Sequence, residues 1–157
     1  MIAQTAPRIN SLYNQDYHLW LEVTLEQLKS KQLSSLDLEH LIGELESMSK
    51  SDKRALKSYL IRLFEHCLKL TSWESERKYN ASHWRLEIAN FRREIKELLK
   101  DSPSLKPYLK EIFADSYLDA RKAFAKALNK KSGDFPDAIA TLEQILDDDW
   151  FPEECQR

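Results

Sequence analysis

Apolar residues recur at spacings of three and four along most of the chain, which is the period of an α-helix with one buried face. The first stripe predicts a helix that begins at Asn14 or Asp16, because either side chain can cap it, and that ends near Lys31. A second stripe, from Leu38 to Met48, predicts a second helix that Ser34 or Ser35 can cap. The polar run at residues 48–52 then predicts a break before the next helix.

The third helix has the most regular stripe in the sequence. Its apolar positions keep a strict alternation of four and three: Leu56, Leu60, Leu63, Cys67 and Leu70. Ile61, Phe64 and Leu68 widen this stripe to nearly half of the helix circumference, which is typical of a helix at the centre of a bundle. Residues 73–81 lose the period and predict a loop.

Two further long helices and one short helix complete the pattern. The fourth begins at the cap Ser82, carries a regular apolar stripe and ends before Pro103, because proline disfavours the helical conformation in the residue before it. A fifth helix begins at the cap Ser104 and is closed by Gly133, a glycine in the position that commonly follows the end of a helix. Residues 141–144 have the capping-box pattern of one more short helix.

These elements predict an all-α fold, a helical bundle of about five long helices with a short C-terminal helix. The chain has only 2 glycines and 5 prolines, too few for the turns of an all-β fold. We expect residues 1–12 to be a flexible arm and residues 13–157 to be one domain, with the acidic segment 134–157 packed on it. We expect a core made of Leu60, Leu63, Phe64, Trp84, Ile88, Phe91, Ile95, Phe113 and Phe124.

Composition narrows the class of protein. The net charge is −2 and the pI is near 6.1, so the chain as a whole lacks the basic footprint of a nucleic-acid-binding protein. The two cysteines, Cys67 and Cys155, have no metal-ligand spacing, and we expect no cofactor. The N-terminus lacks the pattern of a signal peptide, and no run of about 18 apolar residues exists, so we expect a cytoplasmic protein without a membrane contact.

Short motifs of charged and aromatic residues follow one another along the chain. They are Asp16-Tyr17-His18-Leu19-Trp20, Leu36-Asp37-Leu38-Glu39, Gly43-Glu44-Leu45-Glu46, His66-Cys67-Leu68-Lys69, Ser82-His83-Trp84, Arg92-Arg93-Glu94-Ile95, Asp101-Ser102-Pro103-Ser104-Leu105, Tyr117-Leu118-Asp119-Ala120-Arg121 and the tail from Phe135-Pro136 to Pro152. With these motifs in this order, the chain resembles the bacterial family called domain of unknown function 29, DUF29, which is common in cyanobacteria. The resemblance implies a helical fold and no established activity.

One position departs from that family. The family usually has Glu-Glu before Ile-Glu on the second helix, whereas Gly43 holds the first of these positions here. The resemblance therefore implies no role in this chain that needs the first carboxylate.

Three polar residues lie beside apolar stripes and form the first candidate site: Glu44, His66 and Arg92. A carboxylate, an imidazole and a guanidinium that meet between helices could bind a ligand or act in acid–base catalysis. The alternative is a buried hydrogen-bonded network with a structural role. A metal site is a third interpretation, but the nearest motif of the ferritin-like type is Asp37-x-x-His40, with aspartate in place of glutamate.

Residues 76–93 form the second candidate site because basic and aromatic residues alternate there. Its members are Arg77, Lys78, Trp84, Arg85 and Arg93. Cations with stacking aromatics are typical of single-stranded nucleic-acid binding. The alternative is a solvated segment in which Trp84 anchors the core.

The leading hypothesis for function is a non-enzymatic protein-interaction module, which binds a protein partner or a second copy of itself. The alternative is a small enzyme or ligand-binding protein that uses the polar cluster. Nucleic-acid binding through residues 76–93 is the weakest of the three.

Overall fold

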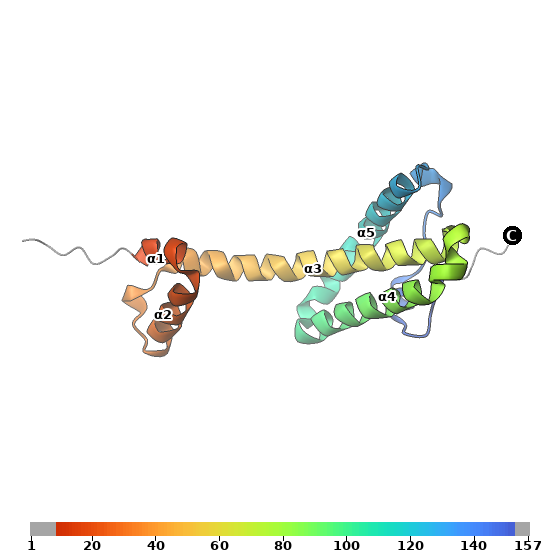
Figure 1. Ribbon diagram of the computed structural model, residues 1–157. Coiled ribbons are helices and arrows are strands. Elements are labelled where there is room, and N and C mark those ends of the chain that lie inside the picture. The colour runs from red at the N-terminus through yellow and green to blue at the C-terminus, as the bar shows by residue number, and fades with distance from the viewer. Residues whose placement is uncertain (1–8, 153–157) are drawn as a thin grey trace, which may run out of the picture. The chain divides into compact units, whose positions relative to one another are not determined.

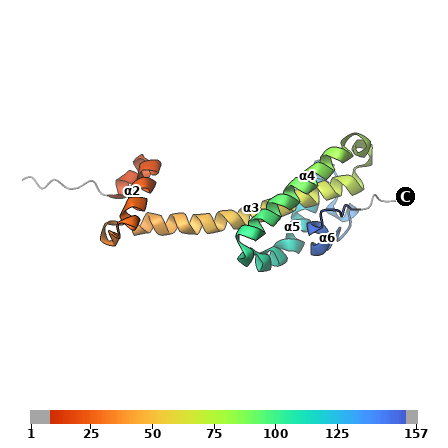
Figure 2. The same cartoon turned by 90° about the horizontal axis from the view of Figure 1, so that it is seen from below.

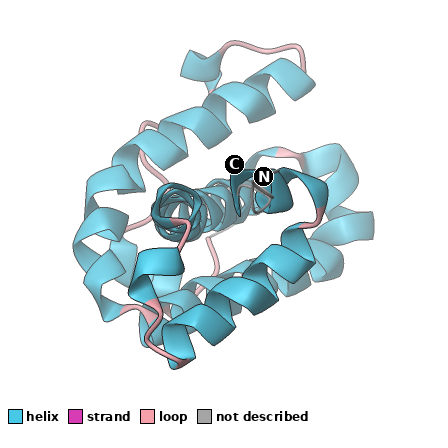
Figure 3. Cartoon of the chain, turned by 90° about the vertical axis from the view of Figure 1, so that its left-hand side faces the viewer, coloured by secondary structure: helices cyan, strands magenta, loops and turns pink. Residues whose placement is uncertain are grey.

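The computed structural model describes residues 9–152, and over this range it contains helices and no strand (Figure 1, Figure 3). The helices are α1 (Ile9–Gln15), α2 (Tyr17–Lys29), α3 (Leu38–Ser72), α4 (Glu74–Asp101), α5 (Lys106–Ala127) and α6 (Leu142–Leu146), with short 3-10 turns η1 (Leu33–Ser35), η2 (Pro103–Leu105) and η3 (Ser132–Asp134). The predicted all-α bundle class is confirmed. Residues 9–12 of the predicted arm are helical, and residues 1–8 lie outside the described range.

The chain divides into two compact units, Met1–Lys50 and Ser51–Arg157, which are called unit 1 and unit 2 below. Unit 1 contains α1, α2 and the first part of α3, and unit 2 contains the remainder of α3 and all later elements. The single domain expected over residues 13–157 stays a prediction.

Two predicted interruptions are absent from the helices. The break at residues 48–52 is wrong because α3 continues through it, and the loop at residues 73–81 is wrong because α4 begins at Glu74. Neither stretch contains proline or glycine, so polar side chains there face solvent while the backbone stays hydrogen-bonded. Glu74 and Glu76 also stabilise the first turn of α4, because acidic groups favour the positive end of a helix.

Capping side chains and backbone conformation determine where several helices begin and end. Asp16 caps α2 by accepting a hydrogen bond from the Leu19 N–H at 2.9 Å, and Thr141 forms the predicted capping box with Gln144. After α5 the left-handed residue is Asn129, with φ 54°, rather than the predicted Gly133. Asparagine tolerates this conformation better than most residues, so the helix ends earlier than the glycine position indicates.

Unit 2 has a large apolar core. In both Figure 1 and Figure 2, α4 runs beside the C-terminal part of α3. Among the described residues, twenty buried apolar side chains from α3, α4, η2, α5 and the C-terminal segment form one cluster. Seven of the nine predicted core residues are buried, and Phe91 and Phe113 are partly buried against the same cluster.

The C-terminal segment packs on this core. Phe135 and Ile145 are buried in it, and Leu142, Leu146, Trp150 and Phe151 are partly buried against it. The Tyr117 hydroxyl donates a hydrogen bond to the Pro136 carbonyl at 2.6 Å. Residues 153–157 of the predicted acidic segment lie outside the described range.

Candidate functional site

The described part of unit 1 is held together by a polar and aromatic network, and Trp20 is the one buried apolar side chain there. Asp37 is 7 % exposed, and its carboxylate accepts a hydrogen bond from Trp20 Nε1 at 3.2 Å. The same carboxylate oxygen lies 2.7 Å from His40 Nδ1, and because a carboxylate only accepts, Nδ1 carries the proton. Asp37 also accepts from the His40 N–H at 3.4 Å, which caps the start of α3.

Glu44 joins this network through two tyrosines. The Tyr13 hydroxyl donates to one carboxylate oxygen at 2.5 Å, and the Tyr17 hydroxyl donates to the other at 2.8 Å. These two hydrogen bonds stabilise the ionised form, so they hold the pKa of Glu44 below its ordinary value. The same bonds raise the pKa of both tyrosines. The Tyr13 ring also stacks on His40, with ring centroids 4.0 Å apart.

This polar–aromatic network ties α1 and α2 to the start of α3, and the sequence reasoning missed it. Its members are Tyr13, Tyr17, Trp20, Asp37, His40 and Glu44. The available signal was the dense block of aromatic and acidic residues in the motifs that begin at Asp16 and Leu36. Within residues 9–152, no three or more histidine, cysteine, aspartate or glutamate side chains lie together as a metal-binding group.

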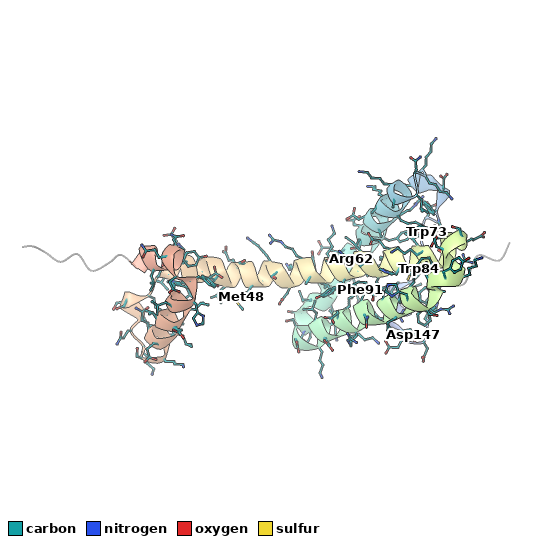
Figure 4. The ribbon with its side chains drawn as sticks, viewed as in Figure 1. Met48, Arg62, Trp73, Trp84, Phe91 and Asp147 are labelled. Atoms are coloured by element: carbon teal, nitrogen blue, oxygen red, sulfur yellow. The ribbon has the colours of Figure 1, made fainter. Side chains whose placement is uncertain are left out.

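Beside this network, α2 and α3 each present an apolar stripe to solvent. The stripe on α2 consists of Tyr17, Leu21, Leu25 and Leu28, and the stripe on α3 consists of Leu38, Ile42, Leu45 and Met48 (Met48 in Figure 4). Their exposed fractions run from 40 % to 64 %. Spacings of three and four place each set on one face of its helix. Unit 1 therefore exposes the face that an amphipathic helix ordinarily buries.

His66 is buried on the second half of α3. Its Nδ1 lies 2.8 Å from the Arg62 carbonyl, so Nδ1 donates, and its ring contacts Phe91 with centroids 5.6 Å apart (Arg62 and Phe91 in Figure 4). Burial disfavours the charged form and lowers the pKa of His66. These contacts fix a neutral imidazole against α4.

Arg92 is fully buried and holds the C-terminal segment. It donates to the carbonyls of Ile145 at 2.6 Å, Asp148 at 3.3 Å and Trp150 at 3.0 Å. Its guanidinium also lies 5.7 Å from the centre of the Phe151 ring. Burial lowers the pKa of Arg92, although the guanidinium stays charged at any ordinary pH. The side chain therefore fastens residues 145–151 to α4.

The three members of the predicted polar cluster have separate partners. Glu44 belongs to unit 1, whereas His66 and Arg92 belong to unit 2. Among the described hydrogen bonds, none joins His66 to Arg92. A site shared by all three stays a prediction.

The predicted basic–aromatic surface contains one buried member. Trp84 is 5 % exposed and stacks on Trp73 with centroids 6.0 Å apart (Figure 4), so its ring is not offered to solvent. Lys78 lies over the exposed Tyr79 ring at 4.6 Å. The remaining cations also have contacts within the chain: Arg77 with the Thr71 carbonyl, Arg85 with the Phe151 ring and Arg93 with Glu94. A nucleic-acid surface at these residues stays a prediction.

Cys67 shows no sign of reactivity. It is fully buried beside Arg92, and burial raises the pKa of its thiol to about 12. A nucleophilic cysteine needs a depressed pKa and access to substrate, so this thiol acts as a small apolar side chain.

Comparison with known proteins gives one match. A family model described as "Domain of unknown function DUF29" matches residues 12–151, nearly the whole described range. The chain belongs to the DUF29 family. No curated protein and no solved structure matches this DUF29 chain. No described helix is long and apolar enough to cross a membrane.

Proposed function

We propose that this DUF29 protein is a non-enzymatic protein-interaction module whose docking surface is the pair of apolar stripes on α2 and α3 of unit 1. The distribution of exposed apolar residues carries this proposal. Of thirteen large apolar residues exposed in the described chain, ten lie between Tyr17 and Met48, and the other three are Tyr79, Leu86 and Leu118.

The area involved is large for a monomer. At roughly half exposure, each large apolar side chain leaves on the order of 80–100 Å² in water, so the eight residues of the two stripes together expose about 640–800 Å². The largest apolar patch on a typical monomer is about 300–600 Å². A standard protein interface covers about 800 Å² on each partner, and the two stripes supply most of that area.

The spacing of the residues favours a helix as the docked element. Partners that bind through a helix use apolar anchors at positions i, i+3 or i+4, and i+7, which match the stripes on α2 and α3. A partner helix laid along either stripe would bury side chains that unit 1 leaves in water.

The contacts of the polar residues favour this function over an enzyme. Glu44 is engaged by two tyrosines and Arg92 by three carbonyls, which ties elements together, and His66 is engaged by a carbonyl of its own helix. We expect the module in the cytoplasm of a bacterium.

The test uses the full chain and a synthetic helical peptide. The peptide has leucines at alternating spacings of three and four and glutamine at its polar positions. Fluorescence anisotropy measures the dissociation constant for the wild type and two matched variants. One is Ile42→Gln with Leu45→Gln in unit 1, and the other is Leu86→Gln with Leu118→Gln in unit 2. All four positions are exposed, so both variants should keep the unfolding free energy of the wild type within about 0.5 kcal/mol each.

We expect the unit 1 variant to bind the peptide at least about tenfold more weakly, because two apolar anchors are lost. The unit 2 variant should bind like the wild type. Absence of binding to the wild type, or an equal loss in both variants, would overturn the proposal.

A further inference from the structure

We infer that the partner of unit 1 is a basic amphipathic helix, whose lysine or arginine residues flank its apolar stripe. This inference rests on the proposed function and names the chemistry of the partner. The observation that carries it is the charge of the docking region. Residues 16–48 contain seven acidic and two basic side chains, a net charge of −5, whereas the whole chain has a net charge of −2.

The acidic residues lie where a partner's cations would reach them. Glu22 and Glu26 follow Leu21 and Leu25 directly on α2, and all four are exposed. A residue that follows another on a helix is rotated by about 100°, so each glutamate borders the stripe instead of interrupting it.

The same relation holds on α3. Glu39 follows Leu38 and Glu46 follows Leu45, and both glutamates are exposed. Apolar stripes on α2 and α3 are thus each bordered by a row of carboxylates. Such a border repels an acidic partner and attracts a basic one, which gives specificity and speeds association.

The charge of residues 16–48 also distinguishes between the partners that could cover the apolar stripes. A second copy of residues 16–48 would bring another net charge of −5 to the same place, and like charges across an interface oppose binding. Nucleic acid and anionic lipid carry the same sign and are disfavoured for the same reason. Lysine and arginine, by contrast, also cover apolar surface with their long aliphatic stems.

The experiment uses the full chain and three helical peptides that share one leucine stripe. Their flanking positions carry lysine, glutamine or glutamate. Dissociation constants are measured by fluorescence anisotropy at low salt and again at about 0.5 M salt. We expect the lysine peptide to bind at least about tenfold more tightly than the glutamine peptide and the glutamate peptide to bind most weakly. High salt should shrink these differences, since exposed charges are screened.

Charge variants of the chain test which carboxylates attract the lysine peptide. Glu39→Gln with Glu46→Gln should weaken binding of the lysine peptide several-fold and leave the glutamine peptide unchanged. The matched control is Glu97→Gln with Glu111→Gln, because these exposed acids lie in unit 2. The control should bind all three peptides like the wild type.

The outcomes separate this inference from the proposed function. Equal binding of the lysine and glutamine peptides, with both sensitive to Ile42→Gln and Leu45→Gln, would overturn the basic partner and keep the docking surface. Failure of all three peptides to bind would overturn both. Sedimentation equilibrium that shows a dimer of the wild type, lost in Ile42→Gln with Leu45→Gln, would also overturn the basic partner, because the occupant would then be a second copy.

Discussion

The two units of this DUF29 chain treat apolar side chains in opposite ways. Over residues 51–152, unit 2 buries twenty apolar residues in one cluster and exposes three large ones. Among the described residues of unit 1, Trp20 is the one buried apolar side chain, and ten large apolar residues are exposed. Unit 2 therefore has a core of its own, whereas unit 1 relies on a polar–aromatic network and leaves its apolar faces open.

The difference is clearest along α3, because this helix carries an exposed apolar stripe in unit 1 and a buried apolar stripe in unit 2. Leu38, Ile42 and Leu45 are exposed by 54–58 %, whereas Leu56, Leu60 and Leu63 are fully buried, although both sets follow the spacing of one helical face. A stripe shows which side of a helix is apolar, but the elements packed on that side decide whether it is buried. The exposed stripe on α3 is the surface that the proposed partner would cover.

The largest expected contrast comes from matched truncations on α3. Leu63→Ala should lower the free energy of unfolding by about 2–5 kcal/mol, because it removes buried apolar contacts and leaves a cavity. Leu45→Ala should change it by less than about 0.5 kcal/mol, because Leu45 is already in water. Urea denaturation measures both values. Similar losses in the two variants would mean that unit 1 has a buried core.

Arg92→Ala should weaken the attachment of the C-terminal segment to unit 2. Three carbonyls lose their donor in a buried place, so we expect a loss of about 2–4 kcal/mol in unfolding free energy. Amide hydrogen exchange should become faster over residues 142–152 in particular. The control Arg93→Ala removes an exposed neighbour and should leave that exchange slow. Unchanged exchange in Arg92→Ala would contradict the role assigned to the guanidinium.

Asp37→Ala tests whether the polar–aromatic network stabilises unit 1. The variant removes the acceptor of both Trp20 and His40, which should cost about 1–3 kcal/mol of local stability. Hydrogen exchange should rise over residues 13–45 and stay unchanged over residues 84–99. If exchange rises equally in both regions, the two units unfold together and the comparison between them fails.

His66 should make unit 2 sensitive to acid. Because burial lowers its pKa, the folded chain binds a proton less readily than the unfolded chain, and stability falls as the pH drops below the usual value of about 6.5. The wild type should therefore lose more unfolding free energy between pH 7 and pH 5 than His66→Gln does. Equal losses in urea denaturation would contradict a buried neutral imidazole.

Glu44 should make the stability of unit 1 depend on pH, with a smaller effect, at lower pH, than His66 has in unit 2. Its lowered pKa means that the carboxylate stabilises the folded unit above the ordinary value of 4.5, and that this stabilisation is lost as the pH falls through the folded pKa. Hydrogen exchange over residues 13–45 should differ between the wild type and Glu44→Gln at pH 6 and converge near pH 3, after correction for intrinsic rates. A difference that persists at pH 3 would show that the tyrosines do not depend on the ionised carboxylate.

Part of the candidate site could be predicted from sequence. The motifs that contain Glu44, His66 and Arg92 were singled out, and each of these residues has specific contacts in the structure. Their partners were not predicted, because Arg92 contacts carbonyls 53 to 58 residues later and Glu44 contacts Tyr13 31 residues earlier. Backbone carbonyls have no sequence signature, so a motif search does not find them.

Most of the local structure can be predicted from sequence. The period of apolar residues indicates most of the helical segments, although it does not predict that α3 continues through residues 48–52 or that α4 begins at Glu74. Asp16 and Thr141 mark two helix starts, because capping depends on residues a few positions apart. Tertiary structure decided which stripes are covered. Leu60 is buried and Ile42 is exposed at equivalent positions of one helix, because burial depends on the path of residues that are distant in the chain. The candidate docking surface follows from that path and not from the stripe alone.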